Sequence, residues 1–171
     1  MQKKIHIIGG PGSGKTSAGV ALSQRFSLPH LDLDEIFWER EATTFGTKAD
    51  PKVRDAALAE FIAQSAWIVE GVYVGNWVLP SFAAADSVIA LRLTVFVRDW
   101  RYSTRWLKRK LGVSPRKQNK RETLKGLWEL CKYNHHYDRT NVPEARALLA
   151  NLGRPLIEVR NLEQLMKYLT A

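Results

Sequence analysis

Short apolar runs alternate along the chain with longer stretches in which apolar residues recur every three or four positions. The runs are rich in β-branched residues and predict buried strands at residues 4–8, 29–33, 67–70, 87–93 and 155–159. The stretches between them predict helices at residues 17–26, 51–65, 76–85, 95–111, 122–137, 143–152 and 161–169. Strands that alternate with helices indicate an α/β fold with a parallel sheet and helices on both faces.

Two of these helices allow more detailed predictions. Asp50 followed by Pro51 is typical of a helix start, with an acidic N-cap and proline at the first helical position. Its buried side should contain Val53, Ala57, Leu58, Phe61 and Ile62. The helix at 95–111 should pack through Phe96, Trp100, Leu107 and Leu111 and expose a cationic face of Arg98, Arg101, Arg105, Lys108 and Arg109. Residues 39–50 and 112–120 are predicted as loops.

The most specific motif lies between the first strand and the first helix. Gly9 to Thr16 read Gly-Gly-Pro-Gly-Ser-Gly-Lys-Thr, which satisfies the pattern of a P-loop (Walker A motif). Glycines let successive backbone N–H groups turn toward an anion, and the helix N-terminus adds partial positive charge. We expect Lys15 to reach the β- and γ-phosphates of ATP and Thr16 to bind Mg²⁺. The predicted nucleotide-binding residues are Gly10, Pro11, Gly12, Ser13, Gly14, Lys15, Thr16 and Ser17.

Acidic residues follow the next strands at the sheet edge where ligands bind in such folds. Asp32 and Asp34 are one residue apart, so an extended chain would place both on one face. Asp34 is a candidate for binding or deprotonating an acceptor hydroxyl, and Asp32 for holding Mg²⁺. Alternatively, Asp34 only caps a helix that begins at Glu35. Glu70 is a candidate for holding a magnesium-bound water or for orienting the acceptor. Alternatively, it forms a salt bridge to an arginine of the basic segment.

Composition narrows the class of protein. The 171 residues suit one domain, 45% of them are hydrophobic and 25% charged, and no run reaches the roughly 18 apolar residues of a membrane span. Cys131 is the only cysteine, which fits a reducing cytoplasm. The net charge is +9. Residues 98–121 account for all of it, because this segment contains ten basic residues and one acidic residue.

The basic segment 98–121 has three interpretations. As a lid, it would close Arg98, Arg101, Arg105 and Arg109 over the transferred phosphoryl group and stabilise its charge. As a polyanion-binding surface, it would contact the phosphates of a nucleic acid. As an ordinary solvated face, it would serve only solubility. We favour the lid.

Three motifs together resemble a known family. The P-loop is similar to that of adenylate kinases. Residues 31–38 (Leu-Asp-Leu-Asp-Glu-Ile-Phe-Trp), residues 67–73 (Trp-Ile-Val-Glu-Gly-Val-Tyr) and the basic residues 101–110 resemble the adenylate-kinase-like DNA topology modulation proteins. The resemblance implies a P-loop NTPase three-layer sandwich, strand order 2-3-1-4-5, a lid, and ATP–Mg²⁺ as phosphoryl donor. Asp32 and Asp34 are also similar to a pair in shikimate kinases, where such aspartates handle magnesium and the acceptor hydroxyl.

We therefore expect residues 1–171 to form one P-loop kinase domain with a lid at about 98–121. It should transfer the γ-phosphoryl group of ATP to a small nucleotide-like or hydroxyl-bearing acceptor in the cytoplasm, without a membrane partner. Its catalytic residues should be Lys15, Asp34, Glu70, Arg98, Arg101, Arg105 and Arg109, with Thr16 and Asp32 for the metal. The alternative is a nucleic-acid-associated NTPase that binds DNA through residues 98–121.

Overall fold

A five-stranded parallel sheet forms the centre of the computed structural model, which describes residues 3–39, 47–113 and 123–170. Its strands are β1 (Lys4–Ile8), β2 (His30–Asp32), β3 (Trp67–Gly71), β4 (Ser87–Leu91) and β5 (Leu156–Val159). They lie in the order β2-β3-β1-β4-β5, and all neighbours are parallel. This confirms the strand order that the sequence predicts.

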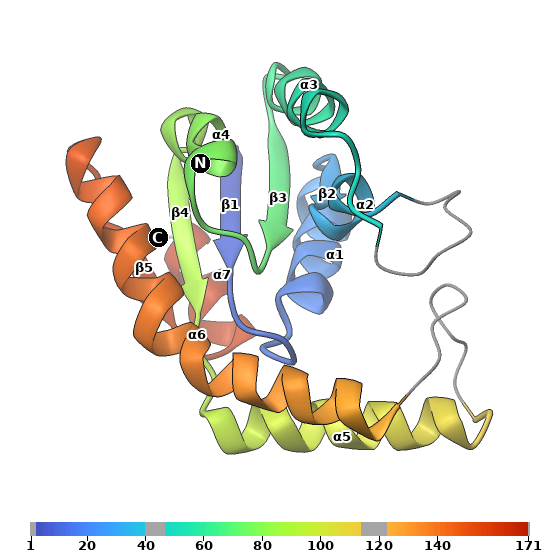
Figure 1. The fold of residues 1–171 in the computed structure, drawn as a ribbon. Helices are drawn as coiled ribbons and strands as arrows, with labels where there is room; N and C mark the ends of the chain where they lie inside the picture. Colours follow the sequence, from blue (N-terminus) through green and yellow to red (C-terminus); the bar gives the residue numbers. More distant parts are fainter. Residues whose placement is uncertain (1–2, 40–46, 114–122, 171) are drawn as a thin grey trace.

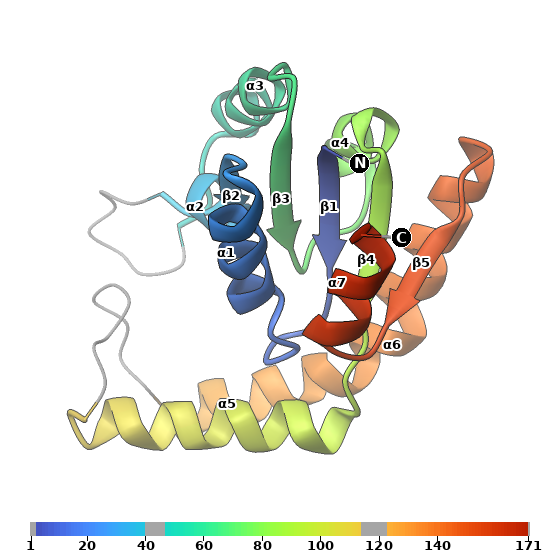
Figure 2. The same ribbon diagram turned by 180° about the vertical axis from the view of Figure 1, so that it is seen from behind.

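Helices cover both faces of the sheet, which makes three layers (Figures 1 and 2). They are α1 (Lys15–Phe26), α2 (Asp34–Phe37), α3 (Pro51–Ile62), α4 (Leu79–Ala84), α5 (Val95–Lys110), α6 (Leu124–Asn151) and α7 (Leu162–Thr170), with a 3₁₀ turn, η1, at Asn76–Val78. Helices α1 and α7 pack on one face, whereas α3, α4 and α6 pack on the other.

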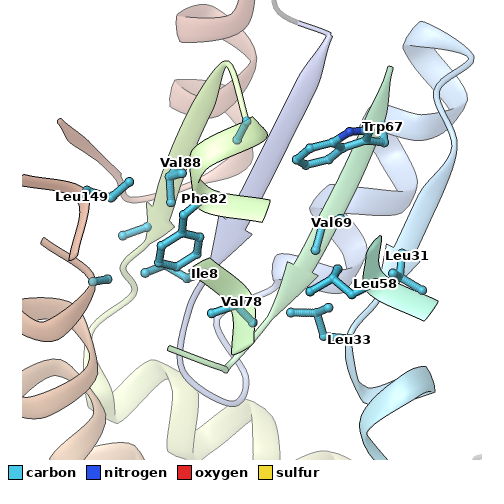
Figure 3. Close-up of a cluster of buried hydrophobic side chains, with 13 residues drawn as sticks. Ile8, Leu31, Leu33, Leu58, Trp67, Val69, Val78, Phe82, Val88 and Leu149 are labelled. Atoms are coloured by element: carbon cyan, nitrogen blue, oxygen red, sulfur yellow. The ribbon is translucent and has the colours of Figure 1, made fainter. Parts of the chain in front are cut away.

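The core follows the alternation of side chains along β1. Ile5 and Ile7 pack with the residues of α1 and α7, while Ile8 joins the cluster on the opposite face. Figure 3 shows this second cluster, in which Phe82 and Leu149 of two helices meet the sheet. All residues of β3 and β4 are buried, as expected for central strands of a sheet covered on both sides.

The predicted start of α3 is confirmed. The Asp50 side chain accepts a hydrogen bond from the Lys52 N–H at 2.7 Å, and Pro51 is the first helical residue. The helix ends at Ile62, and Val53, which the periodicity places on the buried side, is 66% exposed. Within the two predicted loops, residues 40–46 and 114–122 lie outside the described residues.

Helix α6 corrects the prediction of two separate helices near the C-terminus. It runs without a break from Leu124 to Asn151 and contains Pro143. Proline removes one backbone N–H donor and costs about 3 kcal/mol inside a helix. Here Val142, Ala145 and Leu149 are buried on either side of the proline, so packing outweighs the local penalty.

Helix α5 lies beside α6, beyond the carboxyl ends of the strands (Figures 1 and 2). Its packing face is not the predicted one. Phe96, Trp100, Leu107 and Leu111 are all exposed, and Phe96 reaches 82%. The buried face instead contains Arg98, Tyr102 and Trp106 at spacings of four. The helix has aromatic residues on both sides, so periodicity alone did not reveal which side meets α6.

Candidate active site

The P-loop connects β1 to α1 and adopts an anion-binding conformation. Gly12 and Gly14 have φ angles of 79° and 90°, a left-handed region that residues with a Cβ rarely adopt. The Ser13 N–H donates to the Gly10 carbonyl at 3.1 Å, which closes the turn. No side chain caps the start of α1, so its first N–H groups remain available to an anion. Lys15 and Thr16 are the first residues of α1, which begins two residues before the predicted start at Ser17.

An open cleft of about 490 Å³ lies against this loop. Its walls come from the P-loop, the end of β4, α5 and the turn between β5 and α7. The lining residues are Gly12, Ser13, Gly14, Ser17, Ala18, Leu91, Leu93, Arg101, Arg105, Arg160, Asn161 and Leu162. The cleft therefore has the size of a ligand site and has cations on two sides of a phosphate loop.

Sequence reasoning missed the contribution of the turn after β5. Asn161 accepts from the Gln164 N–H at 2.8 Å, and the Gln164 side chain accepts from the Arg160 N–H at 2.8 Å. This reciprocal capping fixes the start of α7 beside the cleft. The signal was available, since the carboxyl end of β5 lies at the same sheet edge as those of the other strands.

The two aspartates lie at the end of β2, but not as an alternating pair. The strand stops at Asp32, whose carboxylate accepts from the Asp34 N–H at 3.0 Å. Asp34 already belongs to α2, for which Leu33 is the N-cap, so the predicted common strand face is wrong. The alternative that Asp34 caps this helix does not hold either. Instead, the exposed Asp34 carboxylate accepts a 2.6 Å hydrogen bond from the Tyr73 hydroxyl.

Glu70 is a buried carboxylate on β3, in register with Asp32 on β2. Within residues 3–39, 47–113 and 123–170, neither of its oxygens has a hydrogen bond of normal geometry, and the His30 Nε2 lies 3.8 Å from one of them. Burial raises the pKa of Glu70 to about 7, although Lys15 opposes the rise. Among the described residues Glu70 forms no salt bridge to an arginine, so the predicted alternative does not hold; the side chain that it pairs with there is His30.

The four arginines assigned to one face of α5 lie in different environments. Arg101 and Arg105 line the cleft, and both are exposed. Arg98 is fully buried and forms a 2.7 Å salt bridge with Asp138 of α6. Arg109 is half-buried and does not line the cleft. The expectation that these side chains share one exposed face is therefore wrong, because α5 turns the face of Arg98 toward α6.

Aromatic side chains pack around Tyr73, the residue whose hydroxyl donates to Asp34. The rings of Phe37 and Tyr73 are stacked with centroids 4.3 Å apart, and Trp77 lies 5.3 Å from Tyr73. The Arg54 guanidinium lies 4.4 Å above the Trp77 ring. Burial and the Asp34 charge raise the pKa of Tyr73, so its hydroxyl stays protonated and can donate. No motif or spacing in the sequence pointed to Arg54 or Trp77.

The residues predicted to hold magnesium fit that ion. Mg²⁺ prefers oxygen ligands and is usually bound by one or two carboxylates together with substrate phosphates and waters. Asp32 and Thr16 supply a carboxylate and a hydroxyl next to the P-loop, and Glu70 adds a carboxylate without a normal hydrogen bond. The described residues contain no group of three or more His, Cys, Asp or Glu that could hold a metal by itself.

Comparisons with known proteins agree with this geometry at the level of the fold. No family model matches the chain. Two curated relatives match in part. The uncharacterized protein YqaC of Bacillus subtilis is 33% identical over 44% of this chain and 41% of that protein. Adenylate kinase 2 of Synechocystis is 36% identical over 40% of this chain and 46% of that protein. The chain thus spans less than half the length of the curated relatives it matches.

Solved structures of shikimate kinases cover almost the whole chain. The enzyme from Bacteroides thetaiotaomicron matches with a TM-score of 0.61 and 16% identity over 100% of both chains. The Acinetobacter baumannii enzyme, in complex with shikimate, matches with a TM-score of 0.61 and 15% identity over 98% of this chain and 93% of that one. None of this confirms the resemblance to DNA topology modulation proteins, which stays a prediction. The chain has the P-loop kinase fold that these shikimate kinases share.

Proposed function

We propose that the protein is an ATP-dependent phosphotransferase that acts on a small, hydroxyl-bearing or nucleotide-like acceptor. The observation that carries the proposal is the convergence of a P-loop, Asp34 and the arginines of the cleft at one edge of the sheet. Phosphoryl transfer depends mainly on positioning and on charge stabilisation, and these groups supply both. The kinase fold of the solved neighbours and the partial match to an adenylate kinase support the same class of reaction.

The donor side of the site consists of the P-loop and the cleft beside it. The loop amides and Lys15 bind the β- and γ-phosphates, and Thr16 and Asp32 hold Mg²⁺. When bound, Mg²⁺ neutralises charge that develops on the phosphate oxygens. Arg101 and Arg105 reach the cleft from α5 and stabilise the same charge. Arg109 stays a proposed member of this group, although it lies farther along the helix.

The acceptor side of the site centres on Asp34. Its exposed carboxylate accepts from the Tyr73 hydroxyl at Oδ1, and its other oxygen, which has no hydrogen bond within the described part of the chain, can accept the proton of a substrate hydroxyl. Glu70 is the second carboxylate of this region and lies close enough to Lys15 for their charges to interact. We propose that Asp34 orients and activates the acceptor and that Glu70 keeps Lys15 and Thr16 in place.

The structure does not support the alternative of a nucleic-acid-associated NTPase. Arg98, the first cation of the basic segment, is buried and paired, while Arg101 and Arg105 line the nucleotide-sized cleft. The solved structures compared above are shikimate kinases. We therefore retain DNA only as an addition to the assays described below.

Substitution of the P-loop lysine tests the proposal. Lys15→Ala removes the cation that contacts the phosphates, so we expect ATP affinity and ATP turnover to fall, the latter about 100-fold or more. Lys167→Ala, an exposed lysine on the last turn of α7, is the matched control and should leave both unchanged. ATP binding is measured by titration calorimetry and turnover by ADP release. Equal values for wild type and Lys15→Ala would show that the P-loop is not the site.

A further inference from the structure

Arg98 is a buried cation at the start of α5 that the donor and acceptor sites leave unexplained. Its side chain is 1% exposed. One guanidinium nitrogen, Nη2, donates to the Asp138 carboxylate at 2.7 Å and to the Asn134 carbonyl at 3.3 Å, both on α6. A buried arginine is costly unless it is paired, and Asp138 of α6 supplies the charge that offsets this cost.

The other side of Arg98 touches the P-loop. A Cβ atom built on Gly10 would lie 1.9 Å from Arg98 Nη1, and one built on Gly12 would lie 2.7 Å from the Arg98 carbonyl oxygen. The guanidinium therefore occupies the space that a side chain at Gly10 would need. Gly10 does not have a positive φ angle, so this contact, rather than backbone conformation, requires glycine there.

The residues around Arg98 fix the guanidinium from α6. The Asn134 side chain is buried, donates to Asp99 at 2.9 Å, and presents its oxygen 3.0 Å from the Cβ position of Gly10. Asp99 also pairs with His135 at 3.0 Å. Adjacent residues of α5, Arg98 and Asp99, are thus tied to one turn of α6, and that turn lies against the back of the P-loop.

We propose that Arg98, held by Asp138, is a positioning residue that keeps the P-loop backbone in place through its contacts with Gly10 and Gly12. Because Arg101 lies one turn farther along the same helix and lines the cleft, the same contact also fixes α5 relative to the phosphates. Arginine suits this role because its planar fork can bind a carboxylate on one edge and pack flat against glycine on its face. Displacements of about 1 Å in a catalytic site can cost 100-fold in rate. This inference rests on the proposed function, since it assumes that the loop binds ATP.

A double-mutant cycle between Gly10 and Arg98 tests the contact. In the wild-type background, Gly10→Ala places a methyl group against the guanidinium, and we expect the Kd for ATP–Mg²⁺ to rise about 10-fold or more. Arg98→Ala should also raise this Kd. Arg98→Ala removes the severe clash at 1.9 Å and leaves the Asn134 oxygen 3.0 Å from the added Cβ, so in this background Gly10→Ala should change the Kd by less than about 2-fold. Titration calorimetry with ATP–Mg²⁺ gives the four constants, and a thermal melt confirms that each variant is folded.

Gly12→Ala is the matched control. Gly12 has a φ of 79° and approaches the Arg98 backbone rather than its side chain, so Arg98→Ala should not relieve the effect of Gly12→Ala. The cycle is also run with Arg98→Lys, which keeps a cation opposite Asp138 but lacks the planar group against Gly10. If Arg98→Ala does not fold, the same comparison is made in the Arg98→Lys background.

Two results would overturn the inference. One is an equal effect of Gly10→Ala in both backgrounds; the other is a folded Arg98→Ala protein with the wild-type Kd and only a lower melting temperature, as a purely structural role predicts. Failure of the proposed function has a different signature, because wild type and Lys15→Ala would then bind ATP–Mg²⁺ equally weakly. A wild-type protein that binds ATP through Lys15 while Arg98→Ala binds it just as well contradicts only the role of Arg98.

Discussion

Among single residues, His6 shows how burial controls ionisation in this protein. It lies in β1 with no exposed surface, and the Phe82 ring approaches it edge-on at 4.7 Å between centroids. The Ser81 hydroxyl donates to the Val78 carbonyl at 2.7 Å, so the 2.9 Å contact with His6 Nδ1 has the imidazole as donor. Its Nε2 has no hydrogen-bond partner among the residues that the structure describes, and burial lowers the pKa of His6 to about 3.

This pKa predicts a specific loss of stability in acid. The unfolded chain binds a proton near pH 6.5, whereas the folded protein does not until about pH 3. The stability that neutral His6 provides is therefore complete above pH 6.5 and declines as the pH falls toward 3. His6→Asn keeps a donor toward Ser81 but does not titrate. From pH 7 to pH 5, the unfolding free energy of the wild type should fall by about 2 kcal/mol more than that of this variant.

Urea unfolding of both proteins at pH 7, 6 and 5 measures this difference. Subtracting the two curves removes the titration of the other groups, which are common to both proteins. If the difference between the two proteins stayed constant across this range, His6 would have the same pKa in the folded and unfolded states, and its burial in β1 would be in error.

Among the elements, the strands were predictable and the orientation of α5 was not. Runs of β-branched residues located the sheet because a central parallel strand is buried on both sides. Helix α5 carries Phe96 and Trp100 on one side and Tyr102 and Trp106 on the other, so the periodicity fits two orientations. What decides between them is Asp138 on α6, which pairs with Arg98. That contact spans 40 residues and no local pattern encodes it.

A matched pair of tryptophans tests this orientation. Trp106 is 8% exposed and Trp100 is 71% exposed on the same helix. Trp106→Ala should lower the unfolding free energy by about 3 kcal/mol or more, because it leaves a cavity between α5 and its neighbours. Trp100→Ala should change it by about 0.5 kcal/mol or less. Chemical unfolding followed by circular dichroism compares the two variants, and a larger loss for Trp100→Ala would reverse the assigned face.

In the whole molecule, the parallel sheet gathers functional groups from distant parts of the sequence at one edge. The P-loop, Asp32, Asp34 and Glu70 could be assigned from sequence, because each follows or ends a recognisable strand. Arg160 and Asn161 could have been assigned by the same rule applied to β5. Arg54 and the Arg98–Asp138 pair could not, since their roles depend on which helices meet. The motif thus located the P-loop, whose role as the donor site stays a proposal, and tertiary contacts determine its surroundings.

The most direct test of phosphoryl transfer follows the γ-phosphoryl group itself. ATP labelled at this group is incubated with the protein and Mg²⁺, together with nucleoside monophosphates, nucleosides or small hydroxy compounds, and with DNA as a separate addition. We expect the label to appear on one class of small acceptor, and Asp34→Asn to reduce this transfer about 100-fold or more while ATP still binds. Label found only in inorganic phosphate with every acceptor, or released only when DNA is added, would contradict the assignment as a small-molecule kinase.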